Sequence, residues 1–370
     1  MASAIGLHQS GRPVYNFASG PAMLPRAVME QAQAEFLDWH GTGISIMEMS
    51  HRSPEFQSII DQSIADLRVL LNINSDYEIL FLQGGATSQF ATVPLNLAGP
   101  NGHACYLHTG HWSGLALADA QRHCAVRVAA SSEATRFSTI PPRADWRVDA
   151  GASYFYYTAN ETIGGVEFHF IPEVSGPPLV SDMTSNFLSR PLDVSRFGIV
   201  FAGAQKNFGP AGLVLVIMRK DLVGRAGPTV PRLYDYATYA GHNSLYNTPA
   251  TFSWYLAALT FAWIRQQGGV EAMEANAIRR SERLYHAIDD SGFYSNPVPA
   301  SFRSRMNVPF TLADPALDPA FRRAAREAGL EALAGHRSVG GMRASLYNGM
   351  PDAGVAALID FMQEFARRHG

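Results

Sequence analysis

Several features that would mark a particular class of protein are missing from this sequence of 370 residues. The formal net charge is only −3, so bulk electrostatics favours neither nucleic acid nor an anionic membrane as a partner. No run of 18 or more apolar residues occurs, and the N-terminal MASAIGLHQSGRP lacks the charged and apolar blocks of a signal peptide. Cys105 and Cys124 are isolated, without a CxxC pair, so no disulfide framework is indicated. We therefore expect a soluble cytoplasmic protein.

Lysine is also scarce, because only Lys206 and Lys220 occur among the 29 lysine and arginine residues. Arginine stays protonated at any working pH, whereas a partly desolvated ε-amine can lose its proton and attack a carbonyl to form a Schiff base. A lysine retained where arginine serves elsewhere is therefore a candidate for chemistry. Whether Lys206 is only a surface lysine depends on its surroundings in GAQKNFGPAG, residues 203–212.

The pattern of apolar segments predicts an α/β fold. Short apolar runs indicate buried strands at 78–82, 104–108, 154–158, 178–182, 198–203 and 212–218. Amphipathic segments such as 54–71 and 113–124 lie between several of these runs, and such alternation predicts a mostly parallel sheet covered on both faces. From about residue 250 long helices dominate, with strand candidates at 306–312 and 338–346. This change predicts a second, smaller α+β domain.

An acid and a lysine each follow one of these strands. Asp182 ends the run PLVSD, and Lys206 comes shortly after GIVFAG. Ligands of an open α/β sheet bind at the carboxyl ends of its strands, so both side chains are expected at one edge. Pyridoxal phosphate needs this pair, because a lysine binds its aldehyde carbon and a carboxylate keeps its ring nitrogen protonated. Taken alone, Asp182 could instead start the turn MTSN.

The segment FLQGGATSQF, residues 81–90, offers a cradle for a phosphate. A strand and two glycines lead into a helix whose first turn carries Thr87 and a serine, so free N–H groups and hydroxyls point one way. A dinucleotide site would need GxGxxG, which is absent here. Trp112 follows another strand and could stack on a flat ring, although an indole is more often part of a core. His108 and His111 lack a third ligand at a supporting spacing, so no metal site is predicted.

Eight segments in order carry a resemblance to a known family. They are VYNFASGPAMLP (14–25), SIMEMSHRSPEF (45–56), NETIGG (160–165), RPLDVSRFG (190–198), GAQKNFGPAG (203–212), YNTPATFSWY (246–255), RSRMNVPF (303–310) and GHRSVGGMRASLYN (335–348). Together they resemble the phosphoserine aminotransferases, a family of class V, fold-type I enzymes that use pyridoxal phosphate. The resemblance extends from about residue 14 to the last helix.

The resemblance implies an architecture and an activity. A large pyridoxal-phosphate domain with a mostly parallel seven-stranded sheet is expected at residues 16–255, and a small C-terminal α+β domain at residues 256–370, on which segment 1–15 would pack. The implied reaction transfers an amino group from L-glutamate to 3-phosphohydroxypyruvate, giving O-phospho-L-serine and 2-oxoglutarate in serine biosynthesis. Formation of 4-phosphohydroxy-L-threonine for pyridoxine biosynthesis stays open. The family also implies a homodimer with shared active sites.

The resemblance further implies roles for individual residues. Lys206 would bind the cofactor and carry the proton. The other residues implied at the cofactor are Asp182 at the ring nitrogen, Trp112 on the ring face, Thr162 at the phenolic oxygen, Ala86, Thr87 and Gln205 at the phosphate, and Asn247 and Thr248 reaching that phosphate from the other subunit. At the substrate, Arg343 would bind the α-carboxylate, Arg52, His336 and Arg337 the distal anion, and Ser19 would lie in the loop that closes over it.

One departure from the family pattern leaves the substrate preference open. Some members have an arginine in the phosphate loop where this chain has Thr87, and that arginine helps to bind the distal anion. Because this chain lacks that arginine, Arg52, His336 and Arg337 are left to bind the distal anion.

Other interpretations predict different residues. A cysteine desulfurase would need a cysteine in the C-terminal half, and none follows Cys124. An aminotransferase of the alanine–glyoxylate or serine–glyoxylate type would have less use for the three cationic residues assigned to the distal anion. A non-catalytic metabolite-binding protein is disfavoured by the presence of both Asp182 and Lys206, and a dehydrogenase by the missing glycine pattern.

Overall fold

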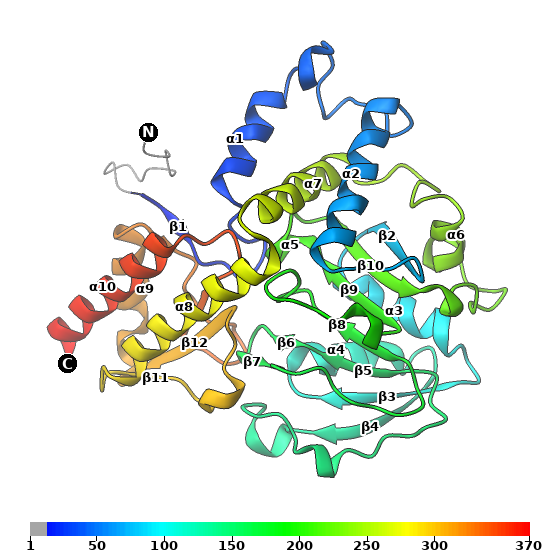
Figure 1. Cartoon of the computed structure of the whole chain (residues 1–370). Coiled ribbons are helices and arrows are strands. Elements are labelled where there is room, and N and C mark those ends of the chain that lie inside the picture. Colours follow the sequence, from blue (N-terminus) through cyan, green and yellow to red (C-terminus); the bar gives the residue numbers. More distant parts are fainter. Residues whose placement is uncertain (1–12) are drawn as a thin grey trace.

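A seven-stranded sheet forms the centre of the larger part of the molecule (Figure 1). The structure is a computed structural model and describes residues 13–370. In spatial order the strands are β2 (Tyr77–Gln83), β10 (Leu213–Arg219), β9 (Ile199–Gly203), β8 (Leu179–Asp182), β5 (Phe155–Thr158), β3 (His103–His108) and β4 (Ala125–Ser131). Strand β10 is antiparallel to both of its neighbours, and the other paired strands run parallel. The predicted mostly parallel sheet is confirmed.

The six strands predicted for this sheet are all present, and β4 is the strand that the sequence pattern missed. Strand β4 lies at the edge of the sheet, and most of its residues are at least partly exposed to solvent. Its sequence AVRVAAS is therefore interrupted by Arg127 rather than continuously apolar. An exposed edge strand does not need the uninterrupted apolar run that marks a buried parallel strand.

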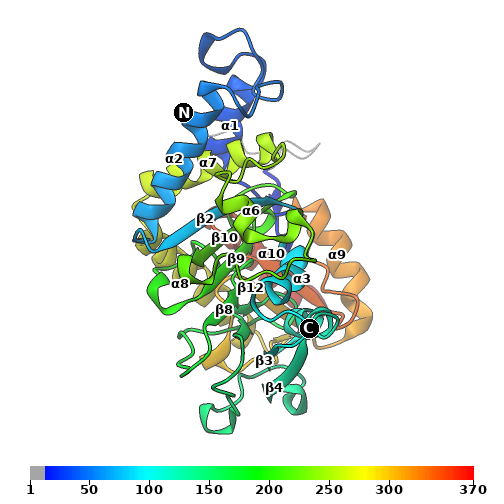
Figure 2. The ribbon, with the colours of Figure 1, turned by 90° about the vertical axis from the view of Figure 1, so that its right-hand side faces the viewer.

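Helices cover both faces of the large sheet (Figures 1 and 2). One face packs on α2 (Pro54–Leu70) and α7 (Thr251–Gln266), and the other on α3 (Ala86–Leu97), α4 (His111–Ala120) and α6 (Tyr236–Ala240). Neighbouring strand residues enter opposite cores, so Leu215 packs in the first and Val214 in the second. This alternation follows from the two-residue period of a strand, and burial on both faces explains the continuous apolar runs.

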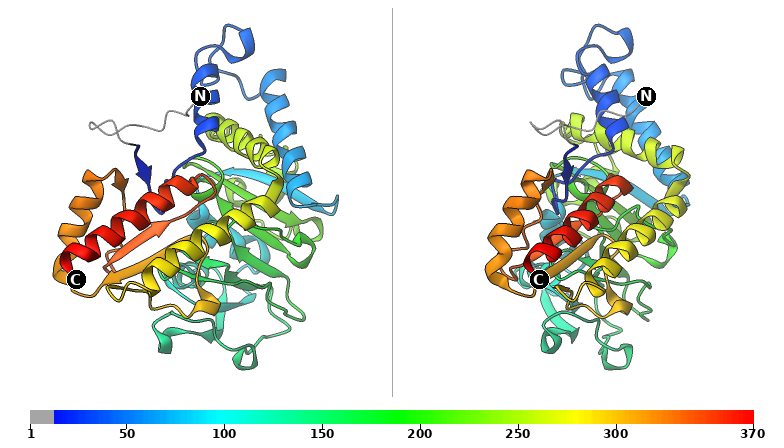
Figure 3. Two further views of the ribbon diagram at one scale, coloured as in Figure 1. Left: turned by 60° about the vertical axis from the view of Figure 1, so that its left-hand side comes forward. Right: turned by 90° about the vertical axis from the view of Figure 1, so that its left-hand side faces the viewer.

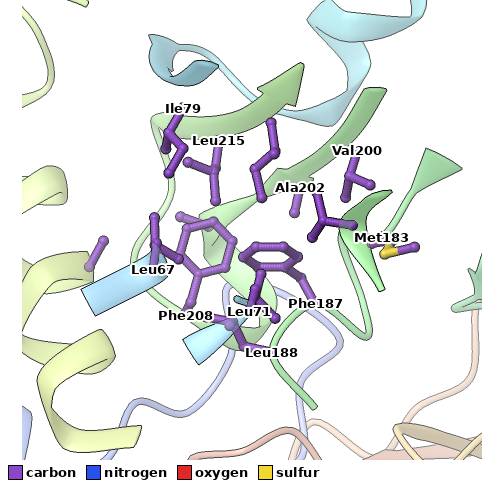
Figure 4. Close-up of a cluster of buried hydrophobic side chains, with 14 of the residues drawn as sticks. Leu67, Leu71, Ile79, Met183, Phe187, Leu188, Val200, Ala202, Phe208 and Leu215 are labelled. Atoms are coloured by element: carbon purple, nitrogen blue, oxygen red, sulfur yellow. The ribbon is translucent and has the colours of Figure 1, made fainter. Parts of the chain in front are cut away.

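The first of these cores closes over the turn that follows β9 (Figure 4). There Phe208, which follows α5 (Ala204–Asn207), lies close to Phe187 from the segment after β8, with ring centroids 5.4 Å apart. Leu67 of α2 belongs to the same cluster. Because Phe208 directly follows α5 and is packed in this cluster, the short helix is held in a fixed orientation at the end of β9.

The C-terminal part of the chain forms a smaller sheet with its own helices (Figure 3). Its order is β11 (Tyr294–Ser295), β12 (Asn307–Leu312) and β14 (Met342–Ser345), with antiparallel pairing. The helices of this part are α8 (Gly269–Asp289), α9 (Asp318–Glu327) and α10 (Asp352–His369). A separate apolar cluster contains side chains from β12 and from all three helices. The expected α+β arrangement is present, although α9 was not predicted.

The N-terminal strand joins the C-terminal part. Strand β1 (Tyr15–Asn16) pairs in parallel with β13 (Leu330–Glu331), and Tyr15 lies in the C-terminal apolar cluster. The expected packing of segment 1–15 falls mostly on residues outside those described, 13–370. The domain boundary expected between residues 255 and 256 falls inside α7 and stays a prediction.

Two further features are a projecting hairpin of helices and a two-stranded ribbon. Helix α1 (Arg26–Glu35) and the start of α2 project from the body of the molecule (Figures 1 and 2). The ribbon consists of β6 (Asn160–Glu161) and β7 (Val166–Glu167). In the part that the structure describes, no helix is both long and apolar enough to span a membrane.

Candidate functional site

Lys206 lies on the one-turn helix α5, which begins immediately after β9. Its side chain is half-buried. The ammonium Nζ donates a hydrogen bond to Oγ1 of Thr162 at 2.5 Å and lies 5.2 Å from the ring centroid of Trp112. Three residues that the sequence separates widely are thus brought together around one amine.

The surroundings of this amine change its acidity. Burial lowers the pKa of Lys206 to about 8, with Asp182 and Glu161 opposing the shift and the charge of Arg343 adding to it. An ammonium in a low-dielectric site is destabilised relative to the neutral amine. A substantial fraction of Lys206 is therefore a neutral nucleophile near pH 8, which an unperturbed lysine is not.

Asp182 occupies the carboxyl end of β8 and lines the same cavity as Lys206. It is only 5% exposed, and its Oδ1 accepts the N–H of Thr184 at 2.8 Å. Burial raises the pKa of Asp182, while the hydrogen bonds from Thr184 and the positive charge of Lys206 lower it. The carboxylate is thus placed to hold a proton on a basic partner inside the cavity.

The start of α3 forms a second wall of this cavity. The helix begins at Ala86 after Gly84, whose φ is +104°, and Gly85 provides no side-chain cap. The N–H groups of Ala86 and Thr87 have no acceptor within the helix, because the first N–H groups of any helix lack one. Gln205 lines the same wall. This arrangement is suited to an anion.

The N-terminal loop covers the lysine. Ala22 donates its N–H to the carbonyl of Gln205 at 2.9 Å. Gly20, with φ at +133°, is so close that an added Cβ would lie 3.1 Å from Cγ of Lys206. Ser19 Oγ in the same loop accepts a hydrogen bond from Nη2 of Arg343 at 2.7 Å. The structure therefore brings Ser19, Arg343 and Lys206 into one site.

Arg343 has no acidic partner in the part of the chain that the structure describes. Besides Ser19, its guanidinium contacts the carbonyl of Thr162 at 3.5 Å. The side chain is half-buried, and burial lowers its pKa. A partly desolvated guanidinium held only by neutral oxygens is well suited to bind a carboxylate bidentately.

His336 lies beside His111, which the sequence suggested only as a metal ligand, and Arg337, the next residue, is exposed. The rings of His336 and His111 have centroids 5.5 Å apart. Burial lowers the pKa of His336, and repulsion by His111, Arg343 and Arg337 adds to this shift. His111 is the first residue of α4, next to Trp112, and that adjacency was the signal that could have placed it near the site.

Seven expected site residues do not line this cavity within the chain: Ser19, Arg52, Asn247, Thr248, His336, Arg337 and Arg343. Asn247 and Thr248 lie in the segment before α7 and do not line it. The carbonyl of Thr248 accepts a hydrogen bond from the side chain of Gln83, and Thr248 is exposed. Arg52 is exposed in the loop just before α2, where its Nε contacts His51 at 3.4 Å.

Other cavity residues were not predicted from the sequence. Thr158, Thr184 and Ser185 line the cavity together with Asn160. Thr158 ends β5, in register with Asp182 at the end of β8. The position of Thr158 at the end of an apolar run was a usable signal, because neighbouring parallel strands end at a common edge.

The residues present fit pyridoxal phosphate. The Nε1 of Trp112 is buried without a hydrogen-bond partner in the described chain, which is uncommon for a buried polar atom. The cavity combines a lysine of lowered pKa, a buried aspartate, an aromatic ring and uncapped helix N–H groups. Within residues 13–370, no group of three or more histidine, cysteine, aspartate or glutamate side chains is arranged to hold a metal ion.

Comparisons with known proteins give one consistent result. Residues 14–358 match the family described as aminotransferase class-V. A phosphoserine aminotransferase of Acidithiobacillus ferrooxidans is 57% identical over 358 residues, which cover 96% of this chain and 99% of the relative. The solved phosphoserine aminotransferase of Bacillus circulans subsp. alkalophilus is 44% identical with a TM-score of 0.94, covering 96% and 99% of the two chains. That of Trichomonas vaginalis, with pyridoxal phosphate bound, is 39% identical with a TM-score of 0.90, covering 95% and 99%.

Proposed function

This chain belongs to the class V aminotransferase family, and from that premise we propose how its own residues perform the reaction of a phosphoserine aminotransferase. The chain has that function and uses pyridoxal phosphate as its cofactor. It transfers the amino group of glutamate to 3-phosphohydroxypyruvate. The main support for the roles of individual residues is that one cavity is lined by Lys206, Asp182, Trp112 and Thr162.

Lys206 is the catalytic residue of this proposal. When bound, pyridoxal phosphate supplies an aldehyde that accepts the amino group and a ring that stabilises negative charge at the substrate α-carbon. Nζ of Lys206 would bind the cofactor, and as a free amine it would take the proton from the substrate α-carbon and deliver it to the former aldehyde carbon of the cofactor. The lowered pKa of Lys206, about 8, supports this role, because the neutral amine is the form that accepts a proton.

The other cofactor residues orient the bound group. Asp182 would hold a proton at the ring nitrogen, and Trp112 would stack on the ring. Thr162, whose hydroxyl accepts a hydrogen bond from Nζ of Lys206, would donate to the phenolic oxygen. The N–H groups at the start of α3, from Ala86 and Thr87, and the side chain of Gln205 bind the phosphate.

The substrate residues divide into two groups. Arg343 binds the α-carboxylate, and Ser19 fixes its guanidinium from the covering loop. His336, Arg337 and Arg52 bind the distal anion, which is a phosphate in phosphoserine and a carboxylate in glutamate. The position of the His336 ring, 5.5 Å from that of His111 and thus near Trp112, supports a distal anion site on this side of the cofactor.

We also propose a homodimer in which each subunit completes the site of the other. Asn247 and Thr248 would then bind the cofactor phosphate of the partner subunit, since neither lines the cavity of its own chain. The projecting hairpin supports a partner contact, because it exposes large apolar side chains. They are Met29, Phe36, Leu37, Ile44 and Met47. Such a group of exposed apolar side chains favours an interface. Because Arg52 lies close to these side chains in sequence, the same interface would bring Arg52 to the site of the partner subunit.

The distal anion site is tested by Arg337→Ala. The substitution is expected to lower kcat/KM for 3-phosphohydroxypyruvate roughly tenfold, since Arg337 is exposed and a charged hydrogen bond contributes about 1.5 kcal/mol at the low end of its range. Unphosphorylated hydroxypyruvate should be nearly unaffected. Steady-state kinetics with glutamate as donor measures both values.

The matched control for this test is Arg323→Ala, which removes an exposed arginine from α9. It should leave both values unchanged. An equal loss for the two acceptors in Arg337→Ala would mean that Arg337 is structural and that the phosphate is bound elsewhere. Whether 4-phosphohydroxy-L-threonine is also made stays a prediction, and the same assay with its oxo acid answers it.

A further inference from the structure

Glu161 is a buried carboxylate that the proposed reaction does not use. It ends β6 in the segment NETIGG and is 1% exposed. Its Oε2 accepts the N–H of Trp112 at 3.0 Å, and its Oε1 accepts the N–H of Ser113 at 2.9 Å. No lysine, arginine or histidine pairs with it in the part of the chain that the structure describes. A buried carboxylate without a cation needs another source of stabilisation.

The start of α4 supplies that stabilisation. Gly110, at the N-cap, has no side chain to accept the first N–H groups of the helix. Glu161, which is 49 positions from Trp112 in the sequence, accepts them instead. The positive end of the helix dipole favours an anion at this place. Ser113 Oγ completes the turn by accepting the N–H groups of Thr109 and Gly110 at 2.9 and 3.0 Å.

Gly110 is required for this contact. A Cβ atom at position 110 would lie 2.4 Å from Cδ of Glu161 and 2.6 Å from its Oε2. Its φ of 168° is ordinary extended backbone, so the glycine is needed for space and not for its conformation. The contact between Glu161 and Trp112 therefore depends on a glycine at position 110.

Glu161 is connected to both groups that contact the amine of Lys206, the Trp112 ring and the Thr162 hydroxyl. Glu161 fixes the backbone of Trp112, whose ring centroid is 5.2 Å from Nζ. The residue after Glu161 is Thr162, whose hydroxyl accepts the hydrogen bond from the same Nζ. A shift of Glu161 would thus move the ring and the hydroxyl that contact the amine together.

We propose that Glu161 is a positioning residue that holds Trp112 and Thr162 in place around Lys206 and provides a fixed negative charge near its amine. The inference rests on the proposed function, because Trp112 and Thr162 are assigned there to the cofactor. Electrostatics agrees with it, since Glu161 is among the groups that raise the pKa of Lys206. Burial raises the pKa of Glu161 itself, with hydrogen bonds from Ser113 and Trp112 opposing.

The test is Glu161→Gln, which keeps the shape of the side chain and removes its charge. The amide presents one oxygen, so it can accept only one of the two bonds while its NH₂ faces the other N–H. In the holoenzyme, the pH midpoint of the visible absorbance of the bound cofactor is expected to fall by up to about one unit. An opposite charge in close contact shifts a pKa by about 1–3 units, and the contacts of Nζ of Lys206 are with Thr162 and Trp112 rather than with Glu161.

A second variant reaches the same residue by a different route. Gly110→Ala keeps the carboxylate and pushes it away from α4, so it should also change the absorbance midpoint and lower the affinity for added pyridoxal phosphate. The control is Asp314→Ala, which removes a carboxylate that accepts the N–H of Ala316 at 2.9 Å in the C-terminal part. It is expected to reduce thermal stability without moving the midpoint.

The outcomes separate the inference from the function on which it rests. If Glu161→Gln and Gly110→Ala lower only the melting temperature, as Asp314→Ala does, Glu161 is merely a helix cap and the inference is wrong. If the unmodified chain itself takes up no pyridoxal phosphate, the proposed function fails first. Should Glu161→Gln not fold, Glu161→Asp keeps the charge at shorter reach, and an unchanged midpoint and cofactor affinity in it and in Gly110→Ala would overturn the inference.

Discussion

Lys206→Arg is expected to abolish transamination while leaving the fold intact. The substitution keeps a positive charge at the end of β9 but replaces an amine of pKa about 8 by a group that stays protonated. Both covalent binding of the cofactor and proton transfer at the α-carbon are then lost. Loss of the proton carrier alone accounts for roughly 10²- to 10⁴-fold in rate.

The measurement is single-turnover formation of pyridoxamine phosphate from glutamate, with cofactor added in excess. Lys220→Arg is the matched control, because it makes the same change at the other lysine, on the surface near Glu78. That variant should react at the rate of the unmodified chain. A near-normal rate in Lys206→Arg would show that the catalytic lysine has been wrongly assigned.

Inactive chains with lesions at Lys206 and Thr248 are expected to restore activity when they assemble together. If a site takes Lys206 from one subunit and Thr248 from the other, a mixed dimer of Lys206→Ala and Thr248→Glu chains has one site with both lesions and one with neither. The glutamate would repel the cofactor phosphate. An isolated mixed dimer should reach about half the activity of the unmodified dimer, as the two-fold symmetry requires.

Differently tagged chains, coexpressed and purified over both tags, provide the mixed dimer. Neither mutant homodimer should exceed background. A mixed dimer of Lys206→Ala with the unmodified chain is the control, since it retains one good site under either arrangement. If the mixed dimer of Lys206→Ala and Thr248→Glu chains is inactive while this control is active, Thr248 serves the site of its own subunit.

The parts of the site that were predicted from sequence follow local rules. Asp182 and Lys206 each come directly after a buried apolar run, and parallel strands end at a common edge, so the order of residues along the chain is enough to predict that they lie close together. The glycines before α3 likewise mark a turn into a helix. Strand β4 was missed because an exposed edge strand carries polar residues and has no continuous apolar run.

The contacts that were not predicted join residues far apart in the chain. Ser19 and Arg343 are 324 positions apart, and no pattern around either residue specifies the other. Glu161 lies within NETIGG but received no role from the sequence, because its contact with Trp112 exists only once β6 and α4 lie side by side. Asn247, Thr248 and Arg52 were assigned by resemblance alone, because no pattern in the sequence relates them to Lys206.

The central claim is that Lys206 holds the cofactor in a site made for phosphoserine, and borohydride reduction followed by peptide mapping tests it directly. The chain has only two lysines, so the covalently trapped cofactor should be found on the peptide with Lys206 and not on that with Lys220. Incubation with phosphoserine before reduction should prevent trapping by converting the cofactor to its amine form, whereas unphosphorylated serine at the same concentration should not. Trapping at Lys220, or equal protection by serine and phosphoserine, would contradict the account.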